Sequence, residues 1–476
     1  MNFLQRIRQK KISIACWLLL IAYCSLNSSC KKESFITSPD ARFRTSVDSV
    51  KFDTVFTTTG SITQSFKIFN DNNQKLRISK IKLMGGISSF YKMNVDGSPA
   101  TEVNNFEIAA NDSAYIFITV TINPNATNLP FIVKDSILFN YNGNTRFVQL
   151  EAFGQNAVFL RNQVITGNVV WTKTLPYVIV GSLRVDTTAT LTIQQGTRVY
   201  LHADAPFLVD GTLIANGVKT DSITFTGDRL DAGYKDLPAS WPGIYFRGKS
   251  KDNVCKYAIV KNAYQAIVVQ SPSINANPKL IMRQCIIDNA YDAGVLCVNT
   301  SMQMDNSLIS NCGANIAIAY GGDYNFTHCT ASSFSNNYIS HKNAVLQVNN
   351  YALQGGTIVT NNLNAIFRNS IFWGEPGFVN NEVVVTKQGS NTFNVLFDRC
   401  LYRAATDPAN ATLTSVIKNQ NPLFDSIDVV KNIYNFRITN AAAPGVNKGI
   451  LTAFVKDLDD KNRNNGLPDL GCYEKQ

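Results

Sequence analysis

The chain has 476 residues, of which 45% are hydrophobic and only 16% are charged, and its formal net charge is +10. This length exceeds one ordinary core, so we expect two domains or a long stack of repeats. Beyond residue 29 the positive charges form no basic run and no motif of mixed basic and aromatic residues, which argues against a nucleic-acid-binding protein.

Residues 1–29 have the pattern of an export signal. Basic residues at positions 6–11 precede an uncharged, largely apolar stretch at 12–26, which is shorter than a membrane span usually is. Small residues then precede Cys30. This arrangement resembles a bacterial lipoprotein signal, which implies diacylation of Cys30 and an outer-membrane location, facing either the surface or the periplasm. A plain signal peptide and an N-terminal anchor remain alternatives.

Residues 30–46 are predicted to be a polar tether, and residues 47–155 an antiparallel β-sandwich. Short segments in the second range alternate apolar and polar residues, and turn sequences such as Asp96-Gly97-Ser98 separate them. About seven such strands are typical of a sandwich. The predicted strands are residues 50–56, 65–69, 76–83, 91–95, 114–122, 136–139 and 147–153.

The arrangement of segments 66–70, 76–78, 111–113 and 150–154 resembles the immunoglobulin-like domains of the abnormal-spindle/hydin type. The resemblance covers about a quarter of the chain. It implies a spacer or a binding module without catalytic residues.

From residue 156 the pattern becomes a repeat, in which a small residue precedes a short apolar strand. The spacings between successive small residues are 27, 22, 22, 41 and 30, which is typical of stacked supersecondary units. The small residues are Ala258, Cys285, Ser307, Cys329, Ser370 and Cys400. The series resembles right-handed parallel β-helix proteins of bacterial surfaces. The predicted fold is therefore all-β, with an immunoglobulin-like sandwich followed by a right-handed parallel β-helix over 156–440.

Stacked coils superpose equivalent side chains, so we expect the six small residues to form a buried column. Seven of the ten cysteines follow Cys30, and three of them occupy this column, which favours a packed column over disulfides. No CxxC motif occurs, so no metal site is predicted. Asn262, Asn289 and Asn311 each follow a small residue by four positions and predict a partial asparagine ladder at one turn.

The residues between the buried positions form a second, mostly apolar row, which must be shielded from water if it faces outward. Alternation places Ile259, Ile286, Leu308, Thr330, Ile371 and Leu401 on the opposite face of the strands. If they face outward, this apolar stripe needs a loop, the sandwich or a partner to cover it; the reverse register would bury the stripe instead. Residues 441–476 resemble the C-terminal segment of secreted bacterial β-helix proteins, and we interpret them as a cap on the open end of the stack.

β-Helix folds include polysaccharide lyases and hydrolases, which use clustered acidic residues with a basic partner. The best such set in this chain is Asp288 and Asp292 with Lys261 and Arg283. Lys261 and Asp288 share a repeat position on adjacent coils, so the simpler interpretation is an ion pair between coils that contributes little to stability.

Four aromatic residues are candidates for stacking on sugar rings: Trp241, Tyr245, Tyr264 and Tyr291. The expected function is non-catalytic: a lipid-anchored surface protein that binds glycan or another macromolecule, such as a cell-surface protein. A polysaccharide lyase or glycoside hydrolase and an adhesin-like component of a surface complex are the alternatives. No cofactor is predicted, and Ca²⁺ enters only if the protein is a lyase.

Overall fold

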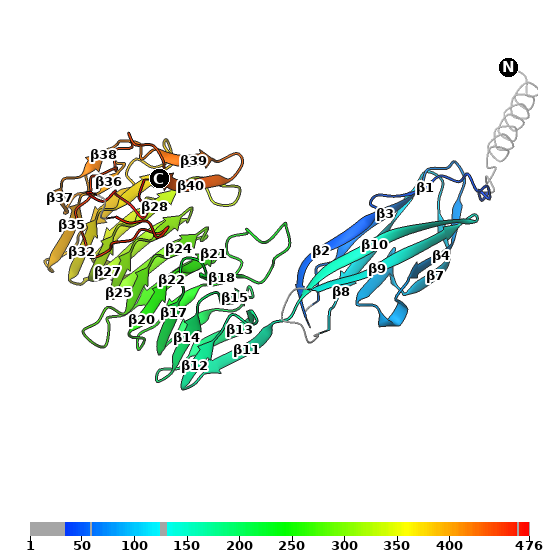
Figure 1. Cartoon of the computed structure of the whole chain (residues 1–476), viewed down its shortest axis with the longest axis horizontal. Coiled ribbons are helices and arrows are strands. Elements are labelled where there is room, and N and C mark those ends of the chain that lie inside the picture. The colour runs from blue at the N-terminus through cyan, green and yellow to red at the C-terminus, as the bar shows by residue number, and fades with distance from the viewer. Residues whose placement is uncertain (1–33, 58–59, 124–130, 464–465, 476) are drawn as a thin grey trace, which may run out of the picture. The chain divides into compact units, whose positions relative to one another are not determined.

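The computed structural model describes residues 34–57, 60–123, 131–463 and 466–475, so the predicted signal and Cys30 lie outside the described residues. The fold is all-β, with an antiparallel immunoglobulin-like sandwich followed by a parallel β-helix (Figure 1). These are two compact units. Within the described ranges, no helix has both the length and the apolar character needed to cross a bilayer.

The sandwich consists of two sheets whose strand orders are β1-β3-β8-β5-β6 and β2-β10-β9-β4-β7. Inward-facing residues such as Ile68, Ile118 and Phe139 alternate with exposed ones and form its core. The elements are β1 (Phe43–Thr45), β2 (Ser49–Phe56), β3 (Gln64–Asn70), β4 (Leu76–Leu83), a short 3₁₀ helix (Gly86–Ser88), β5 (Tyr91–Val95), β6 (Ser98–Pro99), β7 (Glu102–Ile108), β8 (Ser113–Val120), β9 (Phe131–Tyr141) and β10 (Asn144–Gln155).

The sandwich begins earlier than the predicted boundary at residue 47. Strand β1 lies within the predicted tether and pairs with β3, and the Phe43 ring packs in the core 5.5 Å from the ring of Phe139. Strand β7 was also not predicted, because the sequence Glu-Val-Asn-Asn-Phe-Glu-Ile breaks the alternation of apolar and polar residues. It is an edge strand in which Ile108 alone is fully buried, so little burial constrains its sequence.

The β-helix has three faces, each a parallel sheet that takes one strand from each coil. The first sheet contains β12 (Asn168–Trp171), β14 (Thr190–Gln194), β17 (Thr212–Asn216), β20 (Asn253–Lys256), β23 (Leu280–Arg283), the second halves of β25 (Ala293–Asp305) and β27 (Ala314–Thr327), β32 (Leu363–Arg368), β35 (Phe393–Asp398) and β37 (Thr412–Thr414).

The second sheet carries the predicted repeat. It contains the first part of β13 (Tyr177–Val185), β15 (Arg198–Leu201), β18 (Ile223–Gly227), β21 (Ala258–Lys261), β24 (Ile286–Asp288), β26 (Leu308–Ser310), β28 (Thr330–Ser333), β33 (Ile371–Gly374), β36 (Leu401–Tyr402) and β38 (Ile417–Lys418).

The third sheet contains the end of β13, β16 (Phe207–Val209), β19 (Ile244–Phe246), β22 (Gln265–Gln270), the first halves of β25 and β27, β29 (Leu346–Asn349) and β34 (Val383–Thr386). Strand β11 (Val158–Ile165) pairs with β13 along both of its parts. A hairpin of β30 (Tyr351–Gln354) and β31 (Thr357–Thr360) extends from one coil.

The register of the second sheet places the predicted small residues in one column. Ile286 lies opposite Ile259 on one side and Leu308 on the other, so the residues just before them stack as well. All six small residues are buried, and the cysteines of the described residues are free and buried. Cys285 Sγ donates to the carbonyl of Arg283 at 3.3 Å, and Ser307 Oγ donates to that of Asp305 at 2.9 Å. The column therefore suits residues that are small and can still donate a hydrogen bond.

A second column, which the sequence analysis missed, precedes the first. The residue before each small residue has a positive φ, between 45° and 54°, and it bends the chain from the first sheet to the second. These residues are Tyr257, Gln284, Asn306, His328, Asn369 and Arg399. A left-handed conformation costs a non-glycine residue roughly 1 kcal/mol or more, so the stacked sheets on either side must hold each bend. Only the two asparagines and His328 are of residue types enriched in this conformation, which explains why the sequence pattern did not reveal it.

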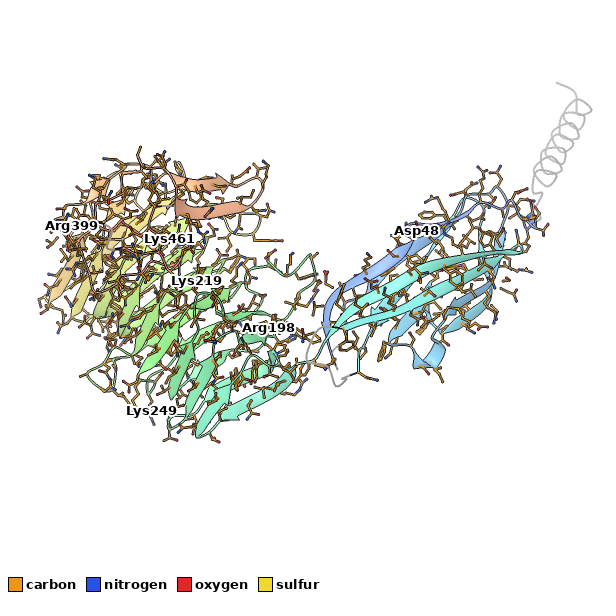
Figure 2. The ribbon with its side chains drawn as sticks, in the orientation of Figure 1. Asp48, Arg198, Lys219, Lys249, Arg399 and Lys461 are labelled. Atoms are coloured by element: carbon orange, nitrogen blue, oxygen red, sulfur yellow. The ribbon has the colours of Figure 1, made fainter. Side chains whose placement is uncertain are left out.

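The prediction of a terminal cap is wrong, because the C-terminal segment lies along the outer side of the second sheet and not over the end of the stack. Asn369 Oδ1 accepts from the amide of Ile450 at 3.0 Å, and Arg463 Nε donates to Asn306 Oδ1 at 2.9 Å. Lys219, labelled in Figure 2, pairs with Asp459 and donates to the carbonyl of Leu458 at 3.1 Å. The segment thus bridges several coils, and the left-handed column supplies many of its attachment points.

The parallel stack ends at Lys418, not at residue 440. Strands β39 (Phe424–Asp428) and β40 (Ile433–Ile438) form an antiparallel hairpin instead of a further coil. Phe436, in β40, is buried against Leu308 and Tyr473. The hairpin and the C-terminal segment together cover the second sheet.

The outer stripe is therefore covered by the chain's own C-terminal part. Ile371 and Leu401 are buried beside Ile438, Ala443 and Leu470. Leu308 packs with Leu458 in a neighbouring cluster. The stripe does face outward, and a segment that was expected to cap the stack covers it, because long apolar rows left in water cost more than an open strand end.

Replacing Leu401, which is fully buried, by Ala is expected to lower the free energy of unfolding by about 2–4 kcal/mol, since it leaves a cavity under the cover. The same substitution at Leu451, which is 66% exposed, is expected to change it by less than about 0.5 kcal/mol. Tryptophan fluorescence during urea unfolding measures both, because Trp171, Trp241 and Trp373 all lie in the β-helix. Equal effects at the two positions would contradict the covered stripe.

Candidate functional site

A polar groove of about 300 Å³ lies where strands of the second sheet end. Parallel strands stacked in register end at the same edge, so the residues that follow them come together. The ends of β21, β24 and β26 form its floor, and the loop before Trp241, the loop 334–344 and the turn of the β39–β40 hairpin form its walls. The lining residues are Asp236, Lys261, Asn262, Asp288, Asn289, Asn311, Asn336, Asn337, Tyr338, Asn432 and Tyr434. We refer to it as the asparagine groove.

The three asparagines predicted to form a ladder line this groove, and all have positive φ, between 51° and 63°. Asn289 Nδ2 donates to Asn262 Oδ1 at 2.9 Å, which is the one rung of the ladder among the described residues. Asn289 Oδ1 accepts instead from Asn336 Nδ2 at 3.1 Å. Asn311 Oδ1 accepts from the amide of Phe334 at 3.1 Å, and its Nδ2 has no partner among the described residues. The groove thus interrupts the ladder and leaves an amide donor free.

Lys261 and Asp288 lie opposite each other on adjacent strands, with 3.5 Å between Nζ and Oδ2. Asp288 Oδ1 also accepts from Ser310 Oγ at 2.7 Å. Both charged side chains are partly exposed, so the pair contributes about 0–1 kcal/mol to stability. The interpretation as an ion pair between coils agrees with this geometry.

The other two members of the candidate catalytic set lie elsewhere. Asp292 Oδ2 accepts from Gln265 Nε2 at 2.7 Å, and Arg283 Nε lies 3.5 Å from Asp305 Oδ2. Neither residue lines the asparagine groove. The structure therefore brings Lys261 and Asp288 together but does not assemble the set of four.

The aromatic residues predicted to bind sugar are not in the groove. Trp241 is 1% exposed and belongs to the core, so its prediction as an exposed platform is wrong. Its Nε1 donates to the carbonyl of Lys261 at 2.8 Å. Tyr264 and Tyr291 are exposed and stack on each other with ring centroids 6.0 Å apart, and Tyr245 donates to the carbonyl of Pro242 at 3.2 Å.

Two tyrosines that the sequence analysis did not single out line the groove instead. Tyr338 is 48% exposed. Tyr434 donates to the carbonyl of Ser335 at 2.8 Å, and burial, reinforced by Glu375, Asp288 and Asp428, raises its pKa to about 12. Both lie outside the repeat, Tyr338 in the loop 334–344 and Tyr434 in β40, where no spacing pattern marks them.

The loop 334–344 is held by a buried carboxylate. Glu382 Oε1 lies 3.0 Å from His341 Nε2 and 2.6 Å from Arg403 Nη2, and all three side chains are largely or fully buried. At the other end of the loop, the amide of Ser335 donates to Glu375 Oε2 at 2.8 Å. These contacts fix the segment that presents Tyr338 to the groove.

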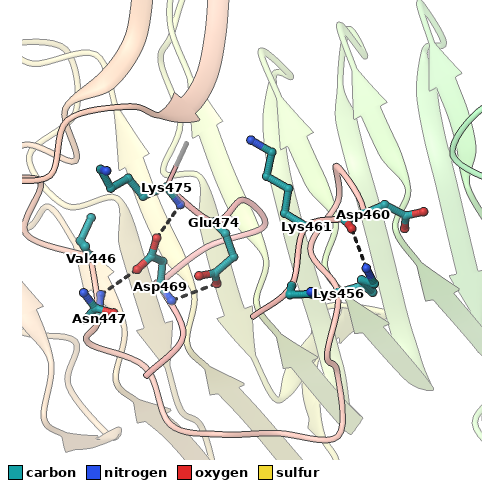
Figure 3. A pocket seen from close by; sticks show the side chains of 9 residues that line it. Val446, Asn447, Lys456, Asp460, Lys461, Asp469, Glu474 and Lys475 are labelled. Atoms are coloured by element: carbon teal, nitrogen blue, oxygen red, sulfur yellow. Dashed lines mark hydrogen bonds between the residues drawn. The ribbon is translucent and has the colours of Figure 1, made fainter. Parts of the chain in front are cut away.

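A hollow of about 430 Å³ in the C-terminal segment has a structural explanation (Figure 3). Its carboxylates bond the local backbone: Asp469 accepts from the amides of Asn447 and Lys475 at 2.7 and 2.6 Å, and Glu474 accepts from that of Asp469 at 3.0 Å. Another hollow, of about 370 Å³, is lined by small, amide and acidic residues around Thr300 and Asp323. Of these three hollows, only the asparagine groove has aromatic residues in its lining.

The described residues of the groove do not form a metal site. Across the described ranges, no three His, Cys, Asp or Glu side chains are grouped so that they could hold a metal ion.

No model of a known protein family matches this chain, and no curated protein matches it. Among solved structures, the catalytic unit of a GH87 α-1,3-glucanase from Streptomyces thermodiastaticus is similar over 75% of this chain and 88% of that chain, at 11% identity and a TM-score of 0.21. A PapD-like domain of human CEP192 matches 26% of this chain and 91% of its own, at 8% identity and a TM-score of 0.18.

A family 123 glycoside hydrolase from Clostridium perfringens matches at 13% identity and a TM-score of 0.18. The match covers 26% of this chain and 26% of that enzyme, so the chain spans about a quarter of the hydrolase. Structural similarities this distant say nothing about the activity of this chain.

Replacing Glu382 by Gln is expected to lower the free energy of unfolding by about 3 kcal/mol, because Arg403 then stays buried without its carboxylate. Asp407→Asn is the matched control: its half-exposed pair with Lys418 predicts a change below about 1 kcal/mol. Urea unfolding followed by fluorescence measures both. If the two variants lose the same stability, the buried carboxylate does not anchor the loop.

Proposed function

We propose that this protein binds glycan in the asparagine groove and does not turn it over. The observation that carries the proposal is the meeting of six asparagine side chains, among them the free Nδ2 of Asn311, with two tyrosines in one hollow. Sugar hydroxyls both donate and accept hydrogen bonds, and an asparagine amide offers both partners. Tyrosine side chains add an apolar ring face with a polar tip. The coil strands hold Asn262, Asn289 and Asn311 in the floor of the groove, and ordered groups of this kind lower the entropy lost on binding.

The second candidate function is glycoside hydrolysis, because two carboxylates, those of Asp236 and Asp288, line the groove. A hydrolase needs one carboxyl group as acid and another as base or nucleophile. Asp288 already accepts from Ser310 and pairs with Lys261, so catalysis would require it to leave both partners. Binding requires no such rearrangement. An adhesin-like role remains the interpretation if no glycan binds.

We further propose that the protein is lipid-anchored through Cys30 at the bacterial outer membrane, on the strength of the sequence pattern at 1–30. Two or more acyl chains give stable anchoring. Mass spectrometry of the N-terminal peptide is expected to show a diacylated cysteine, and Cys30→Ala is expected to move the protein from the membrane fraction to the soluble fraction. An unmodified Cys30 in membrane-bound protein would refute the anchor.

Tyr338→Ala is expected to weaken glycan binding about tenfold, since it removes an exposed ring from the groove wall. Affinity electrophoresis in gels that contain one polysaccharide each measures the change. Tyr264→Ala is the matched control, because Tyr264 is 44% exposed but does not line the groove. Equal losses in both variants would place the site elsewhere.

The same polysaccharides test turnover. Incubation with wild-type protein is expected to release no new reducing or unsaturated ends. A release of reducing ends without unsaturation that Asp288→Asn abolishes would establish the hydrolase in place of the binder, and unsaturated ends would indicate a lyase.

A further inference from the structure

The groove carries an excess of negative charge. Its charged lining residues are Asp236, Asp288 and Lys261. The ammonium of Lys261 faces Asp288 at 3.5 Å, so it is already engaged. The Asp236 carboxylate has no partner among the described residues, since its recorded contact is through its backbone carbonyl. No other cationic side chain lines the described groove.

Further carboxylates lie near the groove. Glu375, Asp288 and Asp428 all act on Tyr434 electrostatically and raise its pKa, after the effect of burial. Asp428 is partly balanced by Lys431 at 3.3 Å. The chain as a whole carries a formal charge of +10, so this acidic groove contrasts with the rest of the molecule.

The uncharged groups point to what the groove accepts. Six asparagines and two tyrosines line it. Asn311 lines the hollow, and its Nδ2 has no partner among the described residues. This amide donor is available to a ligand that offers an acceptor. A sugar hydroxyl supplies that acceptor without adding charge.

We propose that the asparagine groove selects uncharged glycan chains and rejects chains of uronic acids. The inference rests on the proposed function, which names the same groove as a glycan site. A uronate carboxylate placed here would meet Asp236 and Asp288 and would find no free cation. Discrimination of this kind comes from a repulsive element as well as from attraction.

The overall positive charge complicates the measurement, because it attracts polyuronates to any part of the surface. Such attraction weakens at high salt, whereas hydrogen bonding and stacking in the groove do not depend on ionic strength in the same way. Binding is therefore measured at about 0.15 M and 1 M NaCl, where the screening lengths are about 8 and 3 Å.

The test is affinity electrophoresis of the full chain against neutral glucans, mannans and galactans and against polygalacturonate and alginate. We expect a neutral chain to bind at both salt concentrations and Tyr338→Ala to weaken it about tenfold. We expect polyuronates to show only salt-sensitive binding that Tyr338→Ala leaves unchanged. We also expect Asp236→Lys to raise the ratio of polyuronate to neutral affinity at least tenfold.

Asp323→Lys is the matched control, because Asp323 is exposed and lines a different hollow. It makes the same change in net charge and is expected to leave the ratio within about twofold. An equal rise in both variants would overturn the inference. Tyr338-dependent binding of a polyuronate above any neutral chain would overturn it too, while the proposed function would stand. No binding of any glycan would refute the proposed function and the inference together.

Discussion

The structure depends on one constraint: each coil must pair with its neighbours in a fixed register. A slip by one residue in the second sheet would move Cys285 and Ile287 out of the core and Ile286 into it. The register also stacks the left-handed bends, because a residue such as Asn306 adopts positive φ only where the strands on both sides are held. The bends and the buried column are therefore consequences of the same pairing.

The outer face of the second sheet depends on the C-terminal segment in turn. The bends aim Asn306 and Asn369 outward, where they bond Arg463 and Ile450. Ile438, Ala443 and Leu470, which lie before and after those attachment points in the chain, close over Leu401 and its neighbours. A cap at the end of the stack would protect the edge of one coil, whereas this arrangement stabilises several coils at once.

The fold class and the buried column could be predicted because they repeat: the same residue type returns at the same position, and periodicity records it. The position of the C-terminal segment could not, since residues such as Arg463 and Leu470 each contact a different coil and form no pattern. The edge strand β7 was missed for a related reason, because only one of its side chains is fully buried and few packing demands act on the others.

The candidate site likewise has residues that the repeat pattern could predict and residues that it could not. Asn262, Asn289 and the Lys261–Asp288 pair were predictable because they sit at repeat positions. Tyr338 and Tyr434 were not, because Tyr338 lies in a loop that departs from the coil and Tyr434 lies in the β39–β40 hairpin, both outside the repeat. A uniform stack presents uniform faces, and a hollow forms where a departing connection folds back over the strand ends. Specificity in this protein therefore resides in the interruptions of the repeat, while the repeat supplies the rigid floor.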